Sequence, residues 1–523
     1  MTCLFACACI LYIMYKVVIL VFETKMPICC TKRCNLCTQF AKMCYLCTRF
    51  YTNNVINMKK IVTSLAVALA ATSAFAGGLL TTTNQNAHSL RFFAQDADIN
   101  LTSLYANPAG SAFLNKGWHI SASAMTAMQT RSIATTFPLY TFKDGQATHN
   151  FKGEAFAPVV PSFDFAYVQD KWSVSARFGV VAGGGTCEFE NGLGSLEGVA
   201  SKMIMDGVKA NLPGQLALMG VPAEQIPAYV QNIMTNQFRY DLQSSMTGKQ
   251  NYFGFQIGGT YKIIDNLSAY VGVRGVYATC GYTGGIENMR YSVDGGQNFA
   301  PASANILLDC QQSGFGVTPI IGIHYRPIKG LELAAKYEFQ TKISLKNTTT
   351  PESAVATSLL PLYKDGSKVR TDMPALLNIG AQYRPIENVK IAASWRYYFD
   401  KCATKDGYVD GQKTNMNDLL DNNTMEFLAS AEWKFCKWVA ASFSWQNTSY
   451  GLSEANMSDT DFNLSSNSIG AGLRIYPCSF MNIDLGYMHT FYKDRTVTTA
   501  ATQMTNLYSR TNDVVGIGLN FAF

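Results

Sequence analysis

Hydrophobic and polar positions alternate along most of the chain from residue 119 onward. The pattern is clearest at 172–180, 331–340, 389–397 and 481–487. In the second of these, Leu, Leu, Ala, Tyr and Phe alternate with Glu, Ala, Lys, Glu and Gln. Successive side chains of a β-strand point to opposite faces, so each segment predicts a strand with one apolar and one polar face.

The alternation predicts an all-β fold of fourteen antiparallel strands, an even number of the kind that closes a single-chain barrel. The even number also places both chain ends at the same end of the barrel. The strands are predicted at 119–133, 157–168, 171–182, 250–263, 267–280, 314–326, 330–344, 373–384, 388–400, 423–435, 438–448, 467–476, 480–493 and 509–523.

A repeated turn joins these strands on one side. The sequence YRPIKGL at 325–331 returns as YRPIENV at 383–389, with looser copies at 261–267, 433–439 and 476–480. Pro and Asn supply turn chemistry, whereas the connections on the other side are long. Short turns, long opposite loops and aromatic residues at strand ends are typical of a bacterial outer-membrane β-barrel. A soluble sandwich or β-helix would also alternate, but the loop asymmetry argues against both.

The N-terminal 76 residues are predicted to lie outside this fold. Residues 58–76 have the three parts of a secretory signal peptide: Lys59 and Lys60, an apolar core at 61–71, and Ala74-Phe75-Ala76 before the cleavage point. Residues 1–57 precede it, and we interpret them as a spurious upstream extension with Met58 as the true start. They contain an apolar run at 4–22, long enough for a membrane helix.

Four cysteines of this extension, Cys34, Cys37, Cys44 and Cys47, form two C-x-x-C pairs in a near-repeat. The spacer between the pairs is shorter than the 15–20 or so residues of a zinc ribbon. These cysteines are interpreted either as part of a duplicated stretch without function or as a metal site.

Charge and cysteine content change once these segments are subtracted. The whole chain has 42 Lys and Arg against 36 Asp and Glu, a net charge of +6, and 15 Cys. Residues 1–57 carry +5 and nine Cys, and the signal peptide carries +2, so residues 77–523 have a net charge of −1 and six Cys. This balance gives no support to a nucleic-acid partner. Whether Cys280 and Cys310 form a disulfide is left open.

Residues 77–118 do not alternate and are rich in Asn and Asp, which predicts a compact non-strand segment inside the barrel. A family resemblance is based on the stretch NAHSLRFFAQDADINLTSLYANPAG at 86–110, the fourteen strands, the Tyr-Arg-Pro turns and the DLGY at 484–487. In these features the chain resembles the outer-membrane long-chain fatty-acid and aromatic-hydrocarbon transporters (FadL-like). The resemblance implies that 77–118 is an N-terminal hatch in a barrel formed by 119–523, with the gate at Asn107, Pro108, Ala109 and Gly110.

The same resemblance implies passive uptake, with capture by extracellular loops and sideways release at a kink of the third strand. Gly179, Gly183 and Gly184 are the positions at which that strand can bend, since Gly tolerates bulges. The alternative for Gly183 and Gly184 is an ordinary exit from strand to loop.

The longest predicted loop, 183–249, contains two helix-like segments at 196–212 and 223–238. So much apolar surface facing water either packs upon itself or binds an apolar ligand, and the two readings are compatible. The candidate capture residues are Met203, Leu212, Ile226, Tyr229, Ile233 and Met234.

Arg177, Arg274 and Arg396 face the predicted lumen and are candidates for a carboxylate headgroup, because Arg binds carboxylates bidentately. The competing role is an ion pair with the barrel wall or the hatch.

Uptake of hydrophobic compounds, most of all long-chain fatty acids, is the predicted function, and a diffusion porin or a surface adhesin or receptor barrel is the alternative. No GxSxG motif or metal-ligand spacing of the five His points to an enzyme or a cofactor. The expected partners are a fatty acid, detergent or aromatic hydrocarbon, lipopolysaccharide and other outer-membrane lipid, and the barrel assembly machinery. The protein is expected to be a monomer.

Overall fold

The computed structural model describes residues 85–523 except 410–411, 452, 454–456 and 500–502. The predicted upstream extension (1–57), the signal peptide (58–76) and the start of the hatch (77–84) lie outside the described residues. No helix in the described part of the chain is long and apolar enough to cross a membrane.

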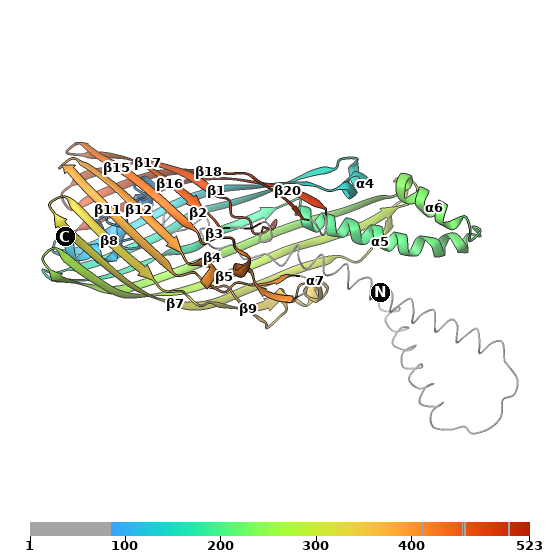
Figure 1. Cartoon of the computed structure of the whole chain (residues 1–523), viewed down its shortest axis with the longest axis horizontal. Coiled ribbons are helices and arrows are strands. Elements are labelled where there is room, and N and C mark those ends of the chain that lie inside the picture. Colours follow the sequence, from blue (N-terminus) through green and yellow to red (C-terminus); the bar gives the residue numbers. More distant parts are fainter. Residues whose placement is uncertain (1–84, 410–411, 452, 454–456, 500–502) are drawn as a thin grey trace, which may run out of the picture. The chain divides into compact units, whose positions relative to one another are not determined.

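Fourteen antiparallel strands form a closed ring, which confirms the predicted barrel (Figure 1). Pairing between β1 and β20 closes it, with His119 opposite Ala522. The strands, in order around the barrel, are β1 (Gly117–Thr136), β2 (Thr148–Val168), β3 (Trp172–Phe189), β4 (Arg239–Ile264), β5 (Leu267–Ser292), β7 (Ile306–Ile328), β8 (Leu331–Glu338), β11 (Leu376–Ile386), β12 (Val389–Tyr398), β15 (Met425–Cys436), β16 (Val439–Ser449), β17 (Ser466–Cys478), β18 (Met481–Tyr492) and β20 (Met504–Ala522).

The repeated turn motif forms tight two-residue hairpins at the end of the barrel where the C-terminus lies (Figure 1). Ile328 pairs with Leu331 across Lys329 and Gly330, and Gly330 has a φ of 84°, a left-handed conformation that Gly adopts without strain. The related hairpins close at the pairs Ile264–Leu267, Ile386–Val389, Cys436–Val439 and Cys478–Met481, each after a register shift. The predicted repeat is therefore a structural repeat.

Several strands are longer than predicted at the opposite, extracellular end. β3 continues to Phe189 and β4 begins at Arg239, so the loop predicted at 183–249 is reduced to 190–238. β8 differs most in the other direction, because it ends at Glu338 rather than at residue 344. β11, β12, β15 and β18 also stop one to three residues short of their predicted bounds at this end. Beyond the bilayer neither face of a strand meets lipid, so strands continue there without the apolar alternation on which the prediction depended.

Shorter elements decorate the extracellular end. The strands are β6 (Ala300–Pro301), β9 (Ser344–Thr349), β10 (Lys368–Arg370), β19 (Arg495–Thr499) and the separate hairpin of β13 (Asp406–Val409) and β14 (Gln412–Asn415). The helices are α4 (Thr141–Asp144), α5 (Gly194–Leu218), α6 (Ile226–Asn232), α7 (Ala354–Leu359) and the short turns η3 (Pro138–Tyr140), η4 (Ile233–Gln237), η5 (Pro351–Ser353), η6 (Pro361–Tyr363), η7 (Asp400–Cys402) and η8 (Met416–Leu419). α5, α6 and η4 confirm the two helical segments predicted in the longest loop.

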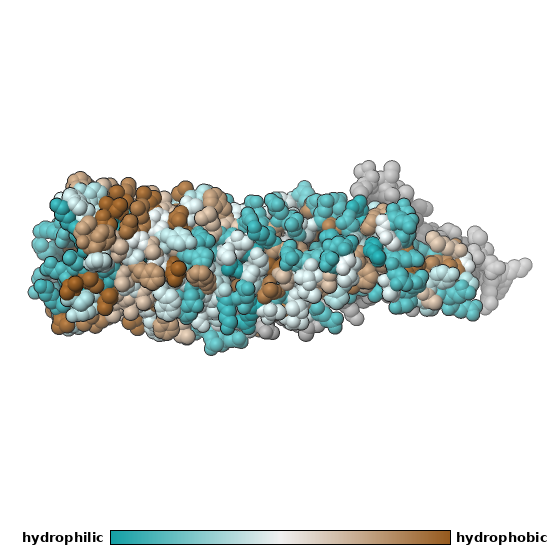
Figure 2. All heavy atoms as spheres, turned by 90° about the horizontal axis from the view of Figure 1, so that it is seen from above, coloured by the Kyte–Doolittle hydropathy of each residue, from teal (hydrophilic) through white to brown (hydrophobic). Residues whose placement is uncertain are grey.

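The barrel wall is apolar outside and polar inside. Large hydrophobic side chains such as Phe163, Val271, Ile323 and Phe443 are exposed on its outer face. On the face drawn in Figure 2, hydrophobic residues gather toward the end with the short turns. Many inward positions of the same strands are Ser, Thr, Asn, Gln or charged residues, and the others are buried apolar residues. The ring of Tyr167 packs against Trp118 in a tilted arrangement and against Trp172 edge-on, near the short turns, with centroid distances of 4.3 and 5.8 Å. A closed barrel with this outer surface and aromatic girdle spans the bacterial outer membrane.

Candidate functional site

The described part of the hatch, residues 85–116, lies inside the barrel (Figure 1). It contains α3 (Ala87–Arg91), η1 (Leu101–Ser103) and η2 (Pro108–Phe113). Each short helix begins at an Asn whose side-chain oxygen accepts a backbone N–H: Asn86 from Ser89, Asn100 from Thr102 and Asn107 from Gly110. The Asn-rich composition of this segment is thus explained by helix capping.

Buried ion pairs hold the hatch to the barrel wall. Arg91 donates from Nε to Asp484 and from Nη1 to Glu432, both at 2.6 Å. The carboxylate of Asp98 lies 3.0 Å from Lys390 Nζ and 3.0 Å from His88 Nε2. Removing one partner of such a buried pair costs about 3–5 kcal/mol, because the other charge is left uncompensated. These pairs therefore fix where the hatch sits.

The predicted gate motif Asn107-Pro108-Ala109-Gly110 contacts the opposite wall. Asn107 Nδ2 lies 2.9 Å from His324 Nδ1 on β7, and the carbonyl of Ala109 accepts a hydrogen bond from Ser268 Oγ at 2.7 Å. A Cβ at Gly110 would lie 2.6 Å from Asn107 Nδ2. The motif is a second attachment point of the hatch, and only Gly at position 110 leaves its Asn cap undisturbed.

The three predicted headgroup arginines each hold a carboxylate of the protein. Arg177 donates to Asp164 at 2.5 Å and to the backbone carbonyl of Gln85 at 2.9 Å. Arg274 binds both oxygens of Glu338, at 2.7 and 2.9 Å. Arg396 pairs with Asp96 of the hatch at 2.9 Å and with Glu426 at 3.5 Å. All three arginines are thus ion-paired with the barrel wall or with the hatch.

The barrel wall is broken between β2 and β3. The pairing of the two strands runs from Val168–Ser173 to Ser162–Gly179 and resumes only at Phe156–Thr186, so no pair connects 157–161 to 180–185. β3 stays paired with β4 through two register shifts, one between Val180 and Ala182 and one between Gly183 and Gly185. The predicted kink glycines therefore lie at the break: Gly179 is its last paired residue, and Gly183 adopts a φ of 71°.

Apolar side chains line the lumen beside this break. We call them the hatch-side apolar cluster: Leu90, Phe92, Phe93, Ala94, Met125, Ala127, Ala157, Val160, Val180, Ala392, Leu428, Met488 and Val514. The first four belong to the hatch, whereas Ala157, Val160 and Val180 belong to the stretches of β2 and β3 that are not paired with each other. The cluster therefore connects the hatch to the break in the wall.

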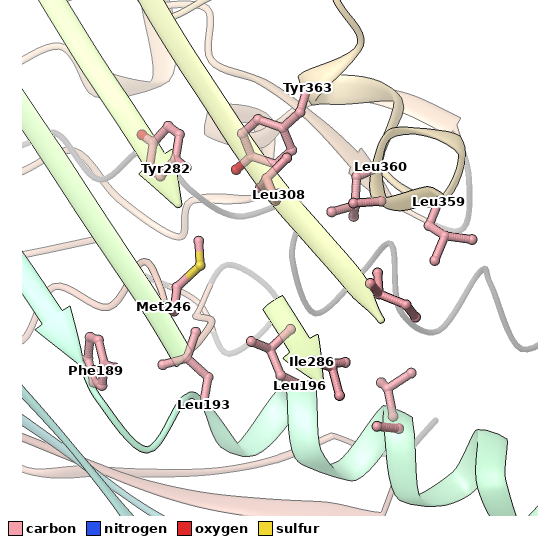
Figure 3. Close-up of a cluster of buried hydrophobic side chains, with 14 of the residues drawn as sticks. Phe189, Leu193, Leu196, Met246, Tyr282, Ile286, Leu308, Leu359, Leu360 and Tyr363 are labelled. Atoms are coloured by element: carbon pink, nitrogen blue, oxygen red, sulfur yellow. The ribbon is translucent and has the colours of Figure 1, made fainter. Parts of the chain in front are cut away.

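A larger apolar cluster fills the extracellular part (Figure 3). We call it the extracellular apolar cluster; its members include Val181, Phe189, Leu193, Leu196, Met246, Tyr282, Ile286, Leu308, Leu359, Leu360 and Tyr363, and also Tyr105 of the hatch. Figure 3 shows Leu196 of α5 and Leu193, the residue before the helix, on the side of Met246 of β4 and Ile286 of β5. The helices of the long loop thus pack against the extended strands.

The predicted capture residues divide into two groups. Leu212 and Met234 are buried within the extracellular apolar cluster, and Met203, Ile226 and Ile233 are partly buried against it. Tyr229 is exposed. The structure therefore brings five of the six predicted residues to one apolar cluster.

Sequence reasoning missed two groups of lumenal residues. Tyr105 of the hatch packs its ring against Arg274, Lys336 and Arg177, with the Arg274 Cζ 4.4 Å from the ring centroid. Arg131 and Arg510 face each other across β1 and β20. Both arginines occupy positions that the alternation of their strands assigns to the lumen, so the sequence pattern alone could have identified them.

Cys280 and Cys310 are both free thiols. Cys280 is opposite Gln312 and Cys310 is opposite Tyr282, so the two cysteines are offset by two residues on neighbouring strands.

No protein-family model and no curated protein matches the sequence. Among solved structures, the chain is similar to a FadL homologue of Pseudomonas aeruginosa, with 12% identity over 86% of this chain and 100% of that chain and a TM-score of 0.57. It also matches the toluene transporter TodX of P. putida (13% identity, 81% and 94% covered, TM-score 0.47) and the toluene transporter TbuX of Ralstonia pickettii (13%, 85% and 98%, 0.48). The chain therefore has the fold of the FadL homologue: a closed antiparallel barrel of fourteen strands.

Proposed function

We propose that the protein is a passive channel for hydrophobic compounds, with long-chain fatty acids as its main candidate substrates. One observation carries the proposal: the two apolar clusters meet at consecutive residues, Val181 of the extracellular cluster and Val180 of the hatch-side cluster. An apolar lining thus continues from the extracellular loops to the break between β2 and β3. The lumen of a general diffusion porin is water-filled and polar.

Entry begins at the long loop in this proposal. Met203, Ile226 and Ile233 lie at the edge of the extracellular apolar cluster and are partly buried, and Tyr229 next to them is exposed. Met adapts its shape to irregular apolar ligands. A ligand captured here first contacts α5 and α6. It then moves into the lumen, where it contacts the strands instead.

The proposed exit is lateral. A hydrophobic ligand leaves toward the outer leaflet of the membrane between the stretches 157–161 and 180–185, which are not paired with each other. The route downward is occupied by the hatch and its buried ion pairs. The Asn107–Gly110 attachment of the hatch is the proposed gate.

The direct test measures binding and uptake with purified protein. A panel of hexadecanoic acid, hexadecane and toluene is titrated against the full barrel, and uptake of the labelled compounds is followed in reconstituted vesicles. At least one member is expected to bind and to be transported. Failure to bind any of them rejects the proposal.

Conductance in planar bilayers separates this function from the porin alternative. A barrel occupied by the hatch is expected to show little ion conductance, whereas a diffusion porin conducts continuously. Large, constant conductance in the wild-type protein would favour the porin.

A further inference from the structure

Two arginines on neighbouring strands face each other inside the barrel. Arg131 on β1 and Arg510 on β20 are directly opposite in register, and Arg510 is only 5% exposed. Side chains that are directly opposite on one face of a sheet have Cβ atoms about 5 Å apart, and like charges in such a pair are destabilising. The pair is therefore costly unless an anion neutralises it.

Neither arginine forms an ion pair with a residue that the structure describes. Arg510 Nε and Nη2 are buried and have no hydrogen-bond partner. Asp461 is near enough to interact electrostatically with Arg131, but its Oδ2 is ion-paired with Lys405 and its Oδ1 forms no hydrogen bond with either arginine. The two arginines thus differ from Arg177, Arg274 and Arg396, which all hold carboxylates of the protein.

A second polar pair lies directly below. Gln129 and Asn512 are opposite each other, two residues along β1 and β20 from the arginines. Gln129 Oε1 accepts a hydrogen bond from Arg131 Nε at 3.0 Å, while Gln129 Nε2 and Asn512 Oδ1 are buried without a partner. The described residues thus leave three buried donor atoms, Arg510 Nε and Nη2 and Gln129 Nε2, unused around one spot.

Apolar groups enclose this polar spot on both sides. On the extracellular side, Ile133 and Tyr508 belong to the extracellular apolar cluster. On the other side, Ala127 and Val514 belong to the hatch-side cluster. The rings of Phe462 and Tyr492 lie against the guanidinium groups, with centroids 5.8 Å from Arg131 Cζ and 4.9 Å from Arg510 Cζ. An ionised group within an apolar lining fits a molecule with an anionic head and an apolar tail.

We propose that Arg131, Arg510 and Gln129 bind the carboxylate headgroup of a long-chain acid on its way through the lumen. This inference rests on the proposed uptake function and deepens it, because it assigns the preferred substrate class as amphipathic acids rather than neutral hydrocarbons. The carboxylate accepts the guanidinium N–H groups and the Gln129 amide, an arrangement that Arg favours for planar anions. The tail then lies along either apolar cluster.

The test compares hexadecanoic acid with its methyl ester, which has the same tail but no charge. Binding of both to the purified full barrel is measured for the wild type, for Arg510→Gln and for Arg290→Gln. Arg290 is half-exposed near the extracellular loops and is paired with Asp241, so its variant has the same charge change outside the lumen.

The wild type and Arg290→Gln are expected to bind the acid more tightly than the ester. Arg510→Gln is expected to weaken acid binding by about tenfold or more, the usual effect of losing a charge-assisted hydrogen bond, and to leave ester binding unchanged. Folding of each variant is checked by its heat-dependent migration in gels. Should Arg510→Gln not assemble, Arg131→Gln takes its place.

Three results would overturn the inference: equal affinity of the wild type for acid and ester, equal loss of both ligands in Arg510→Gln, or no loss of the acid. Each leaves the proposed uptake function standing, because a ligand still binds. Absence of binding of acid, ester and toluene alike would instead reject the uptake function itself.

Discussion

Arg91 of the hatch donates a 2.6 Å hydrogen bond to Asp484 of β18, and both side chains are fully buried. The two residues are 393 positions apart in the sequence. Arg474 of β17 shares the same carboxylate at 2.7 Å. The hatch is thus attached to the wall through the carboxylate of Asp484, which already forms an ion pair with Arg474 of the wall.

Loosening this attachment is expected to open the barrel to ions. In Arg91→Met, Glu432 keeps Lys390 and Asp484 keeps Arg474, so the attachment loses about 3 kcal/mol, the low end for a broken buried pair. Conductance in planar bilayers should rise above that of the wild type. Lys116→Met removes an exposed pair with Asp170 and serves as the control. Unchanged conductance in Arg91→Met would show that this pair does not hold the hatch.

Gly110→Ala is expected to disturb the gate motif without affecting barrel assembly. The new Cβ would lie 2.6 Å from Asn107 Nδ2, the group that contacts His324 and the Asp98 carbonyl. The strain of such overpacking is about 1–3 kcal/mol. Uptake rates in vesicles should change, while Gly207→Ala in α5, where a Cβ meets nothing within 4 Å, should behave as wild type. Identical uptake in both variants would contradict a gating role for the motif.

A bulky side chain at the break between β2 and β3 is expected to slow release but not binding. Ala157 belongs to the hatch-side apolar cluster and lies in the stretch of β2 that is not paired with β3, so Ala157→Trp places a large ring in the proposed exit. Uptake into vesicles should fall while the Kd for the ligand stays near the wild-type value. Phe163→Trp, on the exposed outer face of the same strand, is the matched control. Normal uptake by Ala157→Trp would argue for a different exit.

The stability of the extracellular end is expected to depend on pH through Asp400. Burial raises the pKa of its carboxyl to about 6, although the backbone N–H of Thr424 donates to it at 2.8 Å. Its Oδ1 has no partner. The folded form therefore binds the proton of Asp400 more tightly than the unfolded form does. The resulting contribution to the free energy of unfolding is fully present below about pH 4 and is lost as the pH rises through 6.

Asp400→Asn tests this assignment. The amide oxygen can still accept from Thr424, but no charge is buried, so the variant should be more stable than wild type at pH 7 by about 2–3 kcal/mol and should gain nothing at pH 4. Urea unfolding at the two pH values measures the difference. A gain of equal size at both would show that Asp400 does not titrate as stated.

Local pattern determined most of the barrel from the sequence alone. The fourteen strands, the tight turns after Ile328 and Ile386, and the two helical segments of the long loop are all present where the sequence predicts them, although strand ends differ. Each depends on residues a few positions apart: alternation reflects one lipid-facing side, and a turn needs only its own Pro, Gly or Asn. The ends of the strands beyond the bilayer were missed because no lipid imposes alternation there.

Only the tertiary structure decided which lumenal charges are paired. Arg396 and Arg131 look alike in the sequence, since both face inward from an alternating strand. Arg396 meets Asp96, which the hatch places beside it from 300 residues away, whereas Arg131 faces Arg510 across the seam where the first and last strands join. The break between β2 and β3 is likewise a matter of which strands remain hydrogen-bonded. Pairings of this kind depend on closure of the ring and on the position of the hatch, and both are set by contacts between distant parts of the chain rather than by local pattern.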